Sequence, residues 1–182
     1  MVNVTRKVRI ATVSLAGCFG CHMSFLDIDE ALVGLADKVE FDRSPFTDIK
    51  TVKDCDVGLV EGGVCNAENV EVLREFREQC KVLVSMGACA INGGVPALRN
   101  RFSLEDCLTT AYVDAPGIKN PMIPNDEELP LLLDQVHPIH EVVSVDYFLP
   151  GCPPSAAMIS QFLDQLLNGE TPDFEHNLIH YD

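Results

Sequence analysis

Residues 55–89 read CDVGLVEGGVCNAENVEVLREFREQCKVLVSMGAC, and this stretch decides the fold. It contains an apolar run (55–63), an amphipathic segment (66–80) and a second apolar run (81–89). Short apolar runs without polar alternation are typical of strands that are buried on both faces. The middle segment carries its apolar residues at helical spacing, with charged residues between them. The stretch therefore predicts a strand, a helix and a second strand that runs parallel to the first.

The rest of the chain repeats this alternation. Further strands are expected at 7–15, 39–41 and 141–152, and further helices at 23–36 and 153–169. Strands that alternate with helices are typical of a doubly wound α/β protein. The predicted fold is flavodoxin-like, with a mainly parallel five-stranded sheet and helices on both of its faces.

The spacing of apolar residues predicts how the helices at 23–36 and 153–169 face the core. Pro153 and Pro154 suit the first turn of the second helix, because proline lacks the N–H group that this turn leaves unpaired. In the first helix the inward residues are expected to be Leu26, Leu32, Val33 and Ala36.

The 182 residues are expected to form a single domain, 1–182. Residues 112–140 carry five prolines and mixed polarity, so they are interpreted as an irregular insertion that covers a sheet edge or meets a partner. The polar tail, 170–182, is expected to be loose or docked on another chain.

Charge and composition exclude several classes of protein. A formal net charge of −15 argues against nucleic acid as a partner, because an acidic surface repels phosphates. No apolar run approaches the roughly 20 residues of a membrane span, and no leader peptide is recognisable, so we expect a cytoplasmic protein without membrane contact. In a reducing compartment the eight cysteines are expected to be ligands or buried small residues rather than a disulfide framework.

Four cysteines follow predicted strands. Cys18 and Cys21, in AGCFGCHMS (16–24), follow the first strand, whereas Cys89 and Cys152 follow the fourth and fifth. Because the carboxyl ends of parallel strands meet at one edge of a sheet, these four thiols are expected to lie close together. Glycines beside them let the backbone approach a bulky inorganic ligand.

The other cysteines have different positions. Cys55 and Cys80 begin their strands and so belong to the opposite edge, and Cys107 lies in a helical stretch. These three are interpreted as buried small residues or surface thiols. Cys65 follows the third strand and remains an alternative to one of the four expected ligands.

Three kinds of chemistry suit four converging thiols. A thioredoxin-like dithiol would use Cys18 and Cys21 but would leave Cys89 and Cys152 unexplained. Structural zinc usually takes two close cysteine pairs in a small domain. A [4Fe–4S] cluster needs one thiolate per iron and accepts dispersed ligands in glycine-rich loops, so it is favoured. A flavin phosphate suits the thiol-bearing loop poorly, and no dinucleotide-binding glycine motif follows a strand.

Four blocks in order along the chain resemble the small subunit of [NiFe] hydrogenases, especially the short subunit of the NAD-reducing (bidirectional) type. The blocks are GCFGCHMSFLDIDE (17–30), VEGGVCNAENVEVL (60–73), SMGACAINGGVPALRN (85–100) and YFLPGCPPS (147–155). The resemblance implies that Cys18, Cys21, Cys89 and Cys152 bind the proximal [4Fe–4S] cluster. It also implies two kinds of partner, a large subunit with the Ni–Fe centre and diaphorase subunits with FMN and iron–sulfur clusters that reduce NAD.

Two departures refine this resemblance. The chain has no second set of four cysteines, so one cluster is expected. The related complex I subunit has adjacent cysteines in its first motif, whereas Phe19 and Gly20 separate them here, which favours hydrogenase. F420-, sulfur- or ferredoxin-linked hydrogenases remain alternatives, as do a zinc-stabilised scaffold and a flavin- or dithiol-dependent reductase.

Two further residues lie beside the expected site, and none is expected to be catalytic. Glu61 ends the third strand and is a candidate either for proton movement near the subunit interface or for a hydrogen bond that orients a loop. His22 follows a predicted ligand and is a candidate either for tuning the cluster or for packing the start of a helix.

Overall fold

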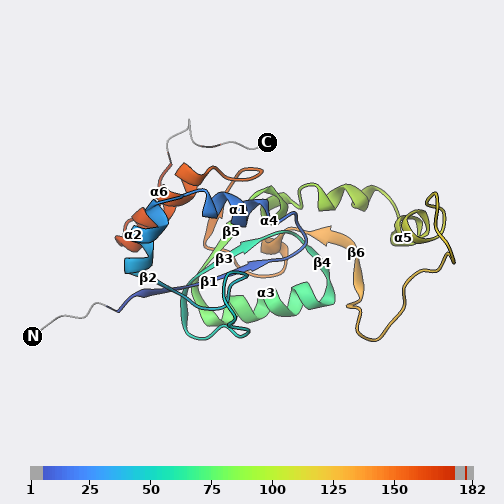
Figure 1. Cartoon of the computed structure of the whole chain (residues 1–182), viewed down its shortest axis with the longest axis horizontal. Helices are drawn as coiled ribbons and strands as arrows, with labels where there is room; N and C mark the ends of the chain where they lie inside the picture. Colours follow the sequence, from blue (N-terminus) through green and yellow to red (C-terminus); the bar gives the residue numbers. More distant parts are fainter. Residues whose placement is uncertain (1–5, 175–178, 180–182) are drawn as a thin grey trace, which may run out of the picture.

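The computed structural model, which describes residues 6–174 and residue 179, contains a sheet of five parallel strands (Figure 1). The strand order is β2-β1-β3-β5-β7. This is the doubly wound order of flavodoxin-like proteins, so the predicted fold class is confirmed. The strands are β1 (Val8–Ser14), β2 (Val39–Phe41), β3 (Cys55–Glu61), β5 (Cys80–Met86) and β7 (Tyr147–Leu149).

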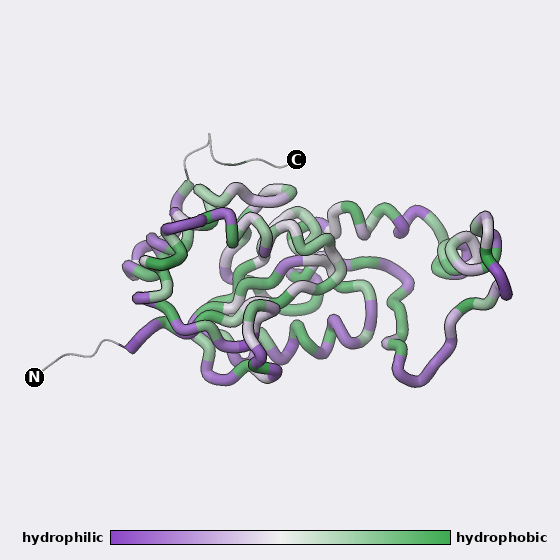
Figure 2. Tube along the Cα trace, viewed as in Figure 1, coloured by the Kyte–Doolittle hydropathy of each residue, from purple (hydrophilic) through white to green (hydrophobic). Residues whose placement is uncertain are grey.

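Helices cover both faces of this sheet (Figure 1). On one face α1, α2 and α6 pack through Phe25, Leu35 and Phe162, and on the other α3 and α4 pack through Phe76 and Ala90. In Figure 2 the central strands are mostly green, whereas α3 alternates green and purple, as expected for a helix with one face on the core. No helix among the described residues is long and apolar enough to cross a membrane. The α-helices are α1 (Gly20–Leu26), α2 (Ala31–Lys38), α3 (Ala67–Gln79), α4 (Ala88–Asn92), α5 (Leu104–Tyr112) and α6 (Ala156–Leu167).

The central strand–helix–strand unit forms as predicted. Asn66 caps α3, because its side chain accepts a hydrogen bond of 2.7 Å from the backbone N–H of Asn69. Leu73 and Phe76 are fully buried, and the chain becomes extended again at Cys80, where β5 begins. The helix therefore returns the chain to the starting end of the sheet.

The predicted helix at 23–36 is wrong as one element. Residue Asp29 adopts a left-handed conformation (φ 55°), which separates α1 from α2. Because the break shifts the helical register, Val33 is 73% exposed and Leu26 37% exposed, whereas Phe25 and Leu35 are buried; Leu32 packs against the core as expected. A single periodic pattern across the break therefore misassigned Leu26, Val33 and Ala36, which are exposed.

Two boundaries near the carboxyl terminus also differ from the prediction. The strand expected at 141–152 is only β7, and a short 3₁₀-helix, η2 (Ile139–Glu141), precedes it. Helix α6 begins after Pro153 and Pro154, because the Ser155 side chain caps it by accepting from the N–H of Met158.

Part of the segment predicted to be irregular, 112–140, is regular. Its strand β6 (Leu132–His137) pairs antiparallel with β4 (Val64–Asn66) in a separate two-stranded sheet. The 3₁₀-helix η1 (Pro96–Arg101) and α5 lead into this segment. In the tail, Phe174 stacks on Phe162 with ring centroids 6.1 Å apart, whereas 175–178 and 180–182 lie outside the described residues.

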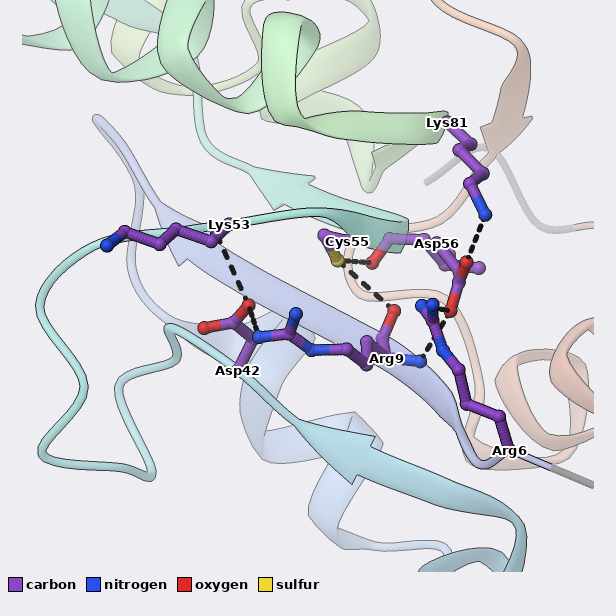
Figure 3. Close-up of polar contacts among 8 residues, drawn as sticks. Arg6, Arg9, Asp42, Lys53, Cys55, Asp56 and Lys81 are labelled. Atoms are coloured by element: carbon purple, nitrogen blue, oxygen red, sulfur yellow. Dashed lines mark hydrogen bonds and ion pairs between the residues drawn. The ribbon is translucent and has the colours of Figure 1, made fainter. Parts of the chain in front are cut away.

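An ionic network holds the amino-terminal edge of the sheet (Figure 3). Asp56 on β3 accepts hydrogen bonds from the backbone N–H of Arg9 on β1 (2.9 Å), from Arg6 (2.9 Å) and from Lys81 on β5 (2.7 Å). Burial alone would raise the pKa of Asp56, but the hydrogen bonds from Lys81, Arg9 and Arg6 outweigh it and lower the pKa. The ionised carboxylate therefore joins three neighbouring strands.

We expect the substitution Asp56→Asn to lower the free energy of unfolding at pH 7 by about 1–2 kcal/mol, because the ion pairs with Arg6 and Lys81 are partly solvated. A lowered pKa in the folded state stabilises the protein above the unfolded pKa of about 3.9, and this stabilisation is lost as pH falls through the folded value. Urea unfolding of both proteins at several pH values should show the difference shrinking towards acid. Glu40→Gln, at an exposed position on β2, is the control, and an unchanged difference at low pH would contradict the ionic explanation.

Candidate metal centre

The structure brings the four predicted cysteines together at the carboxyl edge of the sheet. Cys18 lies in the loop after β1, Cys21 in the first turn of α1, Cys89 in α4 after β5, and Cys152 in the loop after β7. All four line one hollow of about 50 Å³, and all four are free thiols. Their proximity was predicted from topology, while their role as ligands remains a prediction.

Glycines make room for the sulfur atoms. Gly87 has φ 83°, and a Cβ atom there would collide with Sγ of Cys21. Gly94, at φ 47°, leaves a similar space, because a Cβ atom would lie 2.8 Å from Sγ of Cys89. Only glycine adopts such conformations readily and also leaves this space open. The form of the hollow therefore depends on residues that have no side chain.

Hydrogen bonds between the loops fix their relative positions. The N–H of Ala88, beside Cys89, donates to the carbonyl of Gly151, beside Cys152 (2.8 Å). The hydroxyl of Ser24 on α1 donates to the carbonyl of Pro154 (2.6 Å). These contacts link all three cysteine-bearing segments, so the thiols are held in place by the surrounding backbone. The role of Ser24 had no sequence signal, because its partner is 130 residues away.

A buried polar chain lies behind Cys21. Glu61 is 2% exposed, and its Oε2 accepts a hydrogen bond from the backbone N–H of Cys21 (3.0 Å). Its Oε1 lies 2.8 Å from Nδ1 of His22, which is also buried. The other ring nitrogen of His22 is 2.9 Å from Oγ1 of Thr12, which in turn contacts Oγ of Ser44 at 2.8 Å. The sequence indicated Glu61 and His22, but it gave no sign of Thr12 or Ser44.

The titratable groups in and beside this buried chain of polar side chains shift the pKa values of one another. Burial alone would raise the pKa of Glu61, but contacts with His22, Ser14 and Cys21 outweigh it and lower the pKa, so the side chain is a carboxylate. Burial, and then the charge of Glu61, raise the pKa of the Cys21 thiol. Burial also raises the pKa of Cys89. Deprotonation of these thiols therefore requires a cationic group that binds the resulting thiolates.

Aromatic rings close the side of the site at His22. The ring of Phe19 stacks on His22 with centroids 4.6 Å apart, and Phe46 meets His22 edge to face at 5.5 Å. Phe19 has φ 67°, a conformation that few non-glycine residues adopt. This residue, predicted only as a spacer between two cysteines, thus also covers the imidazole.

The other cysteines lie outside the hollow. Cys55 and Cys80 are buried neighbours in strand register at the opposite edge, as predicted. Cys107 lies on α5. Cys65 lies on β4, where its thiol is 3.4 Å from Oδ1 of Asn69, and it does not line the hollow. The geometry therefore favours the predicted set of four over the alternative with Cys65.

The number of donors suits a group that takes four thiolates. Sulfur ligands of a tetrahedral zinc ion lie about 3.8 Å apart, because each Zn–S bond is ~2.3 Å long. Among the described residues, no three His, Cys, Asp or Glu side chains form a group that could hold a metal ion. Four thiols distributed around a hollow, with one thiolate available per iron, match the ligand requirement of a [4Fe–4S] cluster.

Comparison with known proteins gives a matching family and close relatives. The family described as NADH ubiquinone oxidoreductase, 20 Kd subunit, matches residues 18–166. The delta subunit of the NAD-reducing hydrogenase HoxS of Cupriavidus necator is 49% identical over 185 residues, which cover 99% of this chain and 88% of that protein. A subunit of the F420-non-reducing hydrogenase vhu of Methanococcus voltae is 36% identical over 95% of this chain but only 61% of its own length.

A solved structure is similar over nearly the whole chain. One chain in the crystal structure of an NAD+-reducing [NiFe]-hydrogenase in the H2-reduced state is 60% identical and has a TM-score of 0.96. The match covers 97% of this chain and 100% of that chain. The fold described above therefore also occurs in a crystallised hydrogenase.

We expect Gly87→Ala to destabilise the protein by about 2–4 kcal/mol and to reduce its bound iron, because alanine strains the backbone and its Cβ meets the Cys21 sulfur. Thermal unfolding and iron analysis after anaerobic purification would measure both effects. Gly34→Ala on α2 is the matched control, since a Cβ atom there meets nothing within 4 Å. Equal iron content in the two variants would show that the space at Gly87 is not required for the metal centre.

Proposed function

Because the chain belongs to the NADH ubiquinone oxidoreductase 20 Kd subunit family and is a small subunit of the [NiFe] hydrogenase type, we propose that it relays electrons within an NAD-reducing [NiFe] hydrogenase. The resemblance predicted from the sequence is confirmed, and with it the assignment to an oxidoreductase. The 49% identity to the NAD-reducing subunit, against 36% to the F420-non-reducing one, favours NAD over the other acceptors.

One observation carries the proposal: four free thiols from three segments line a single hollow at the carboxyl edge of the sheet. In this proposal Cys18, Cys21, Cys89 and Cys152 hold one [4Fe–4S] cluster, one thiolate for each iron. The bound cluster supplies one-electron transfer. The surrounding backbone holds the thiols in place, and the partly buried position of Cys21 and Cys89 limits their contact with water.

The remaining chemistry belongs to partner subunits. A large subunit holds the Ni–Fe centre at which hydrogen is split, and diaphorase subunits with FMN and iron–sulfur clusters reduce NAD in the cytoplasm. The acidic chain itself needs no nucleotide site in this arrangement. A zinc-stabilised scaffold is the competing proposal, and it is less favoured because the four thiols come from three dispersed segments rather than from two close pairs.

The decisive test is the substitution Cys152→Ser in the complete enzyme complex. The variant complex should contain about four iron and four sulfide fewer than the wild-type complex, because one iron of the cluster loses its thiolate. Hydrogen-dependent NAD reduction should fall at least a hundredfold, whereas hydrogen–deuterium exchange by the large subunit should persist. Anaerobic iron and sulfide analysis, electron paramagnetic resonance and the two assays would measure these changes.

Cys65→Ser is the matched control, because this half-buried thiol lies on the same side of the sheet but outside the hollow. It should retain the iron and the activity. If Cys65→Ser removed the cluster and Cys152→Ser did not, the ligand set would be wrong. One zinc and no iron in the wild-type chain would overturn the electron-relay function itself.

In the same proposal Glu61 orients the Cys21 loop. Its carboxylate accepts a hydrogen bond from the Cys21 backbone and lies 2.8 Å from Nδ1 of His22 in a buried setting, so its removal leaves that N–H group without its acceptor. A role in proton movement would require an open path to another carrier, and the buried contacts support the orienting role more directly.

Glu61→Ala should therefore lower stability by about 3 kcal/mol and the iron content by more than half. Glu61→Gln keeps an oxygen acceptor for Cys21 and should retain most of the iron. Glu71→Ala, at an exposed position on α3, is the control. Identical iron loss in the alanine and glutamine variants would indicate that iron retention depends on the negative charge of Glu61 rather than on its hydrogen bond to the loop.

A further inference from the structure

Residues 95–132, here called the arm, project from the sheet. The arm begins after Gly94 beside Cys89, runs through η1 and α5, and ends where β6 begins at Leu132. Figure 1 shows α5 and the following segment, in yellow-green and yellow, extending well beyond the strands. No residue of α5 is buried. A helix with no buried residue gains little from tertiary packing, which is the usual source of helix stability.

The arm concentrates exposed apolar side chains. Of the 17 large hydrophobic side chains that are exposed among the described residues, 11 belong to it. Leu131 is 80% exposed and Met122 is 73% exposed. Scattered exposed apolar residues are ordinary, but such a concentration marks an interaction surface. The 11 residues are Val95, Leu98, Phe102, Tyr112, Val113, Ile118, Met122, Ile123, Leu129, Leu131 and Leu132.

A hollow of about 400 Å³ lies between α5 and residues 124–132. Leu104, Leu108 and Tyr112 line it from the helix, and Leu129 and Leu132 line it from the opposite segment. A hollow of this size and lining accommodates one or two apolar side chains of another protein, as the buried centre of an interface does.

The base of the arm is held firmly. The side chain of Asn100 donates to the carbonyl of Val136 and accepts from its N–H, both at 2.8 Å. Arg99 donates to the carbonyls of Leu133 (2.7 Å) and Asp134 (2.9 Å). These bonds join η1 to β6, so the arm is fixed relative to the segment that carries Cys89. An apolar surface that is already held rigid loses less conformational entropy on binding than a mobile one.

The charges of the arm indicate the chemistry of its partner. The arm, residues 95–132, has six acidic and three basic residues, and beyond its base, at 102–132, there are six acidic residues and one basic residue. A partner that covers the apolar centre therefore needs lysine or arginine at its rim. The acidic residues are Glu105, Asp106, Asp114, Asp126, Glu127 and Glu128, and the basic residues are Arg99, Arg101 and Lys119.

We propose that the arm docks on the hydrogenase large subunit, through an apolar surface with a basic rim. This inference rests on the proposed function. The arm starts at the edge of the sheet that holds the thiols. A subunit that covers this edge can therefore also contact the arm. Similarity to the Methanococcus voltae protein, whose name excludes F420 as acceptor, extends over 95% of this chain. A large subunit is a partner common to hydrogenases with different electron acceptors, whereas a diaphorase subunit is not. Similarity over 95% of the chain therefore fits docking on the large subunit better than docking on a diaphorase subunit.

The test uses the double substitution Met122→Asp with Leu131→Asp in the tagged chain, co-expressed with all its partner subunits. Both positions are exposed, so the variant should fold. Retention of the nickel-containing large subunit should fall at least tenfold, while the iron content of the tagged chain stays unchanged. Val33→Asp is the control, because Val33 is 73% exposed on α2, far from the arm in Figure 1. It should retain every subunit.

The outcomes separate this inference from the proposed function. Loss of the diaphorase subunits with retention of the large subunit would overturn docking on the large subunit. So would retention of all subunits, or a dimer of the isolated chain that the double substitution disrupts. Absence of iron from the wild-type chain would refute the cluster but would leave the docking measurement valid, since subunit retention is scored separately.

Discussion

The common direction of the five strands is the constraint on which the rest of the structure depends. Because every strand in the order β2-β1-β3-β5-β7 points the same way, all the segments that follow the strands gather at one edge. Cys18, Cys89 and Cys152 are far apart in sequence and meet only for this reason. The same direction places Cys55 and Cys80 at the other edge, where they pack as buried residues.

Topology of this kind can be predicted from the sequence, because it depends on patterns that are local. The apolar runs of β3 and β5 and the amphipathic period of α3 each lie within a few residues, and together they imply a parallel sheet. Once the strand directions were known, the convergence of four thiols followed without any knowledge of side-chain positions. The positions of Glu61 and His22 followed for the same reason, since each is adjacent to a strand end or a cysteine.

What the sequence did not reveal depends on contacts between distant residues or on single backbone angles. The separation of α1 from α2 depends on the left-handed Asp29, and few non-glycine residues adopt that conformation. Strand β6 exists through pairing with β4, about 70 residues away, so the prolines near it suggested an irregular segment. Thr12, Ser24 and Ser44 join the polar contacts around the site through distant partners.

The two edges of the sheet differ in whether contacts within the chain compensate their charged and apolar groups. At the amino-terminal edge, Asp56 meets three donors from the same chain, so its charge is compensated internally. At the carboxyl edge, the Glu61 carboxylate lies beside four thiols in a protein whose net charge is already −15. Four thiolates are unfavourable there without a cationic group to bind them. The arm beside this edge likewise exposes apolar surface that the described residues do not cover. In the proposed function both features lie where the chain would meet a cluster and a partner, whereas the amino-terminal edge is held by contacts within the chain.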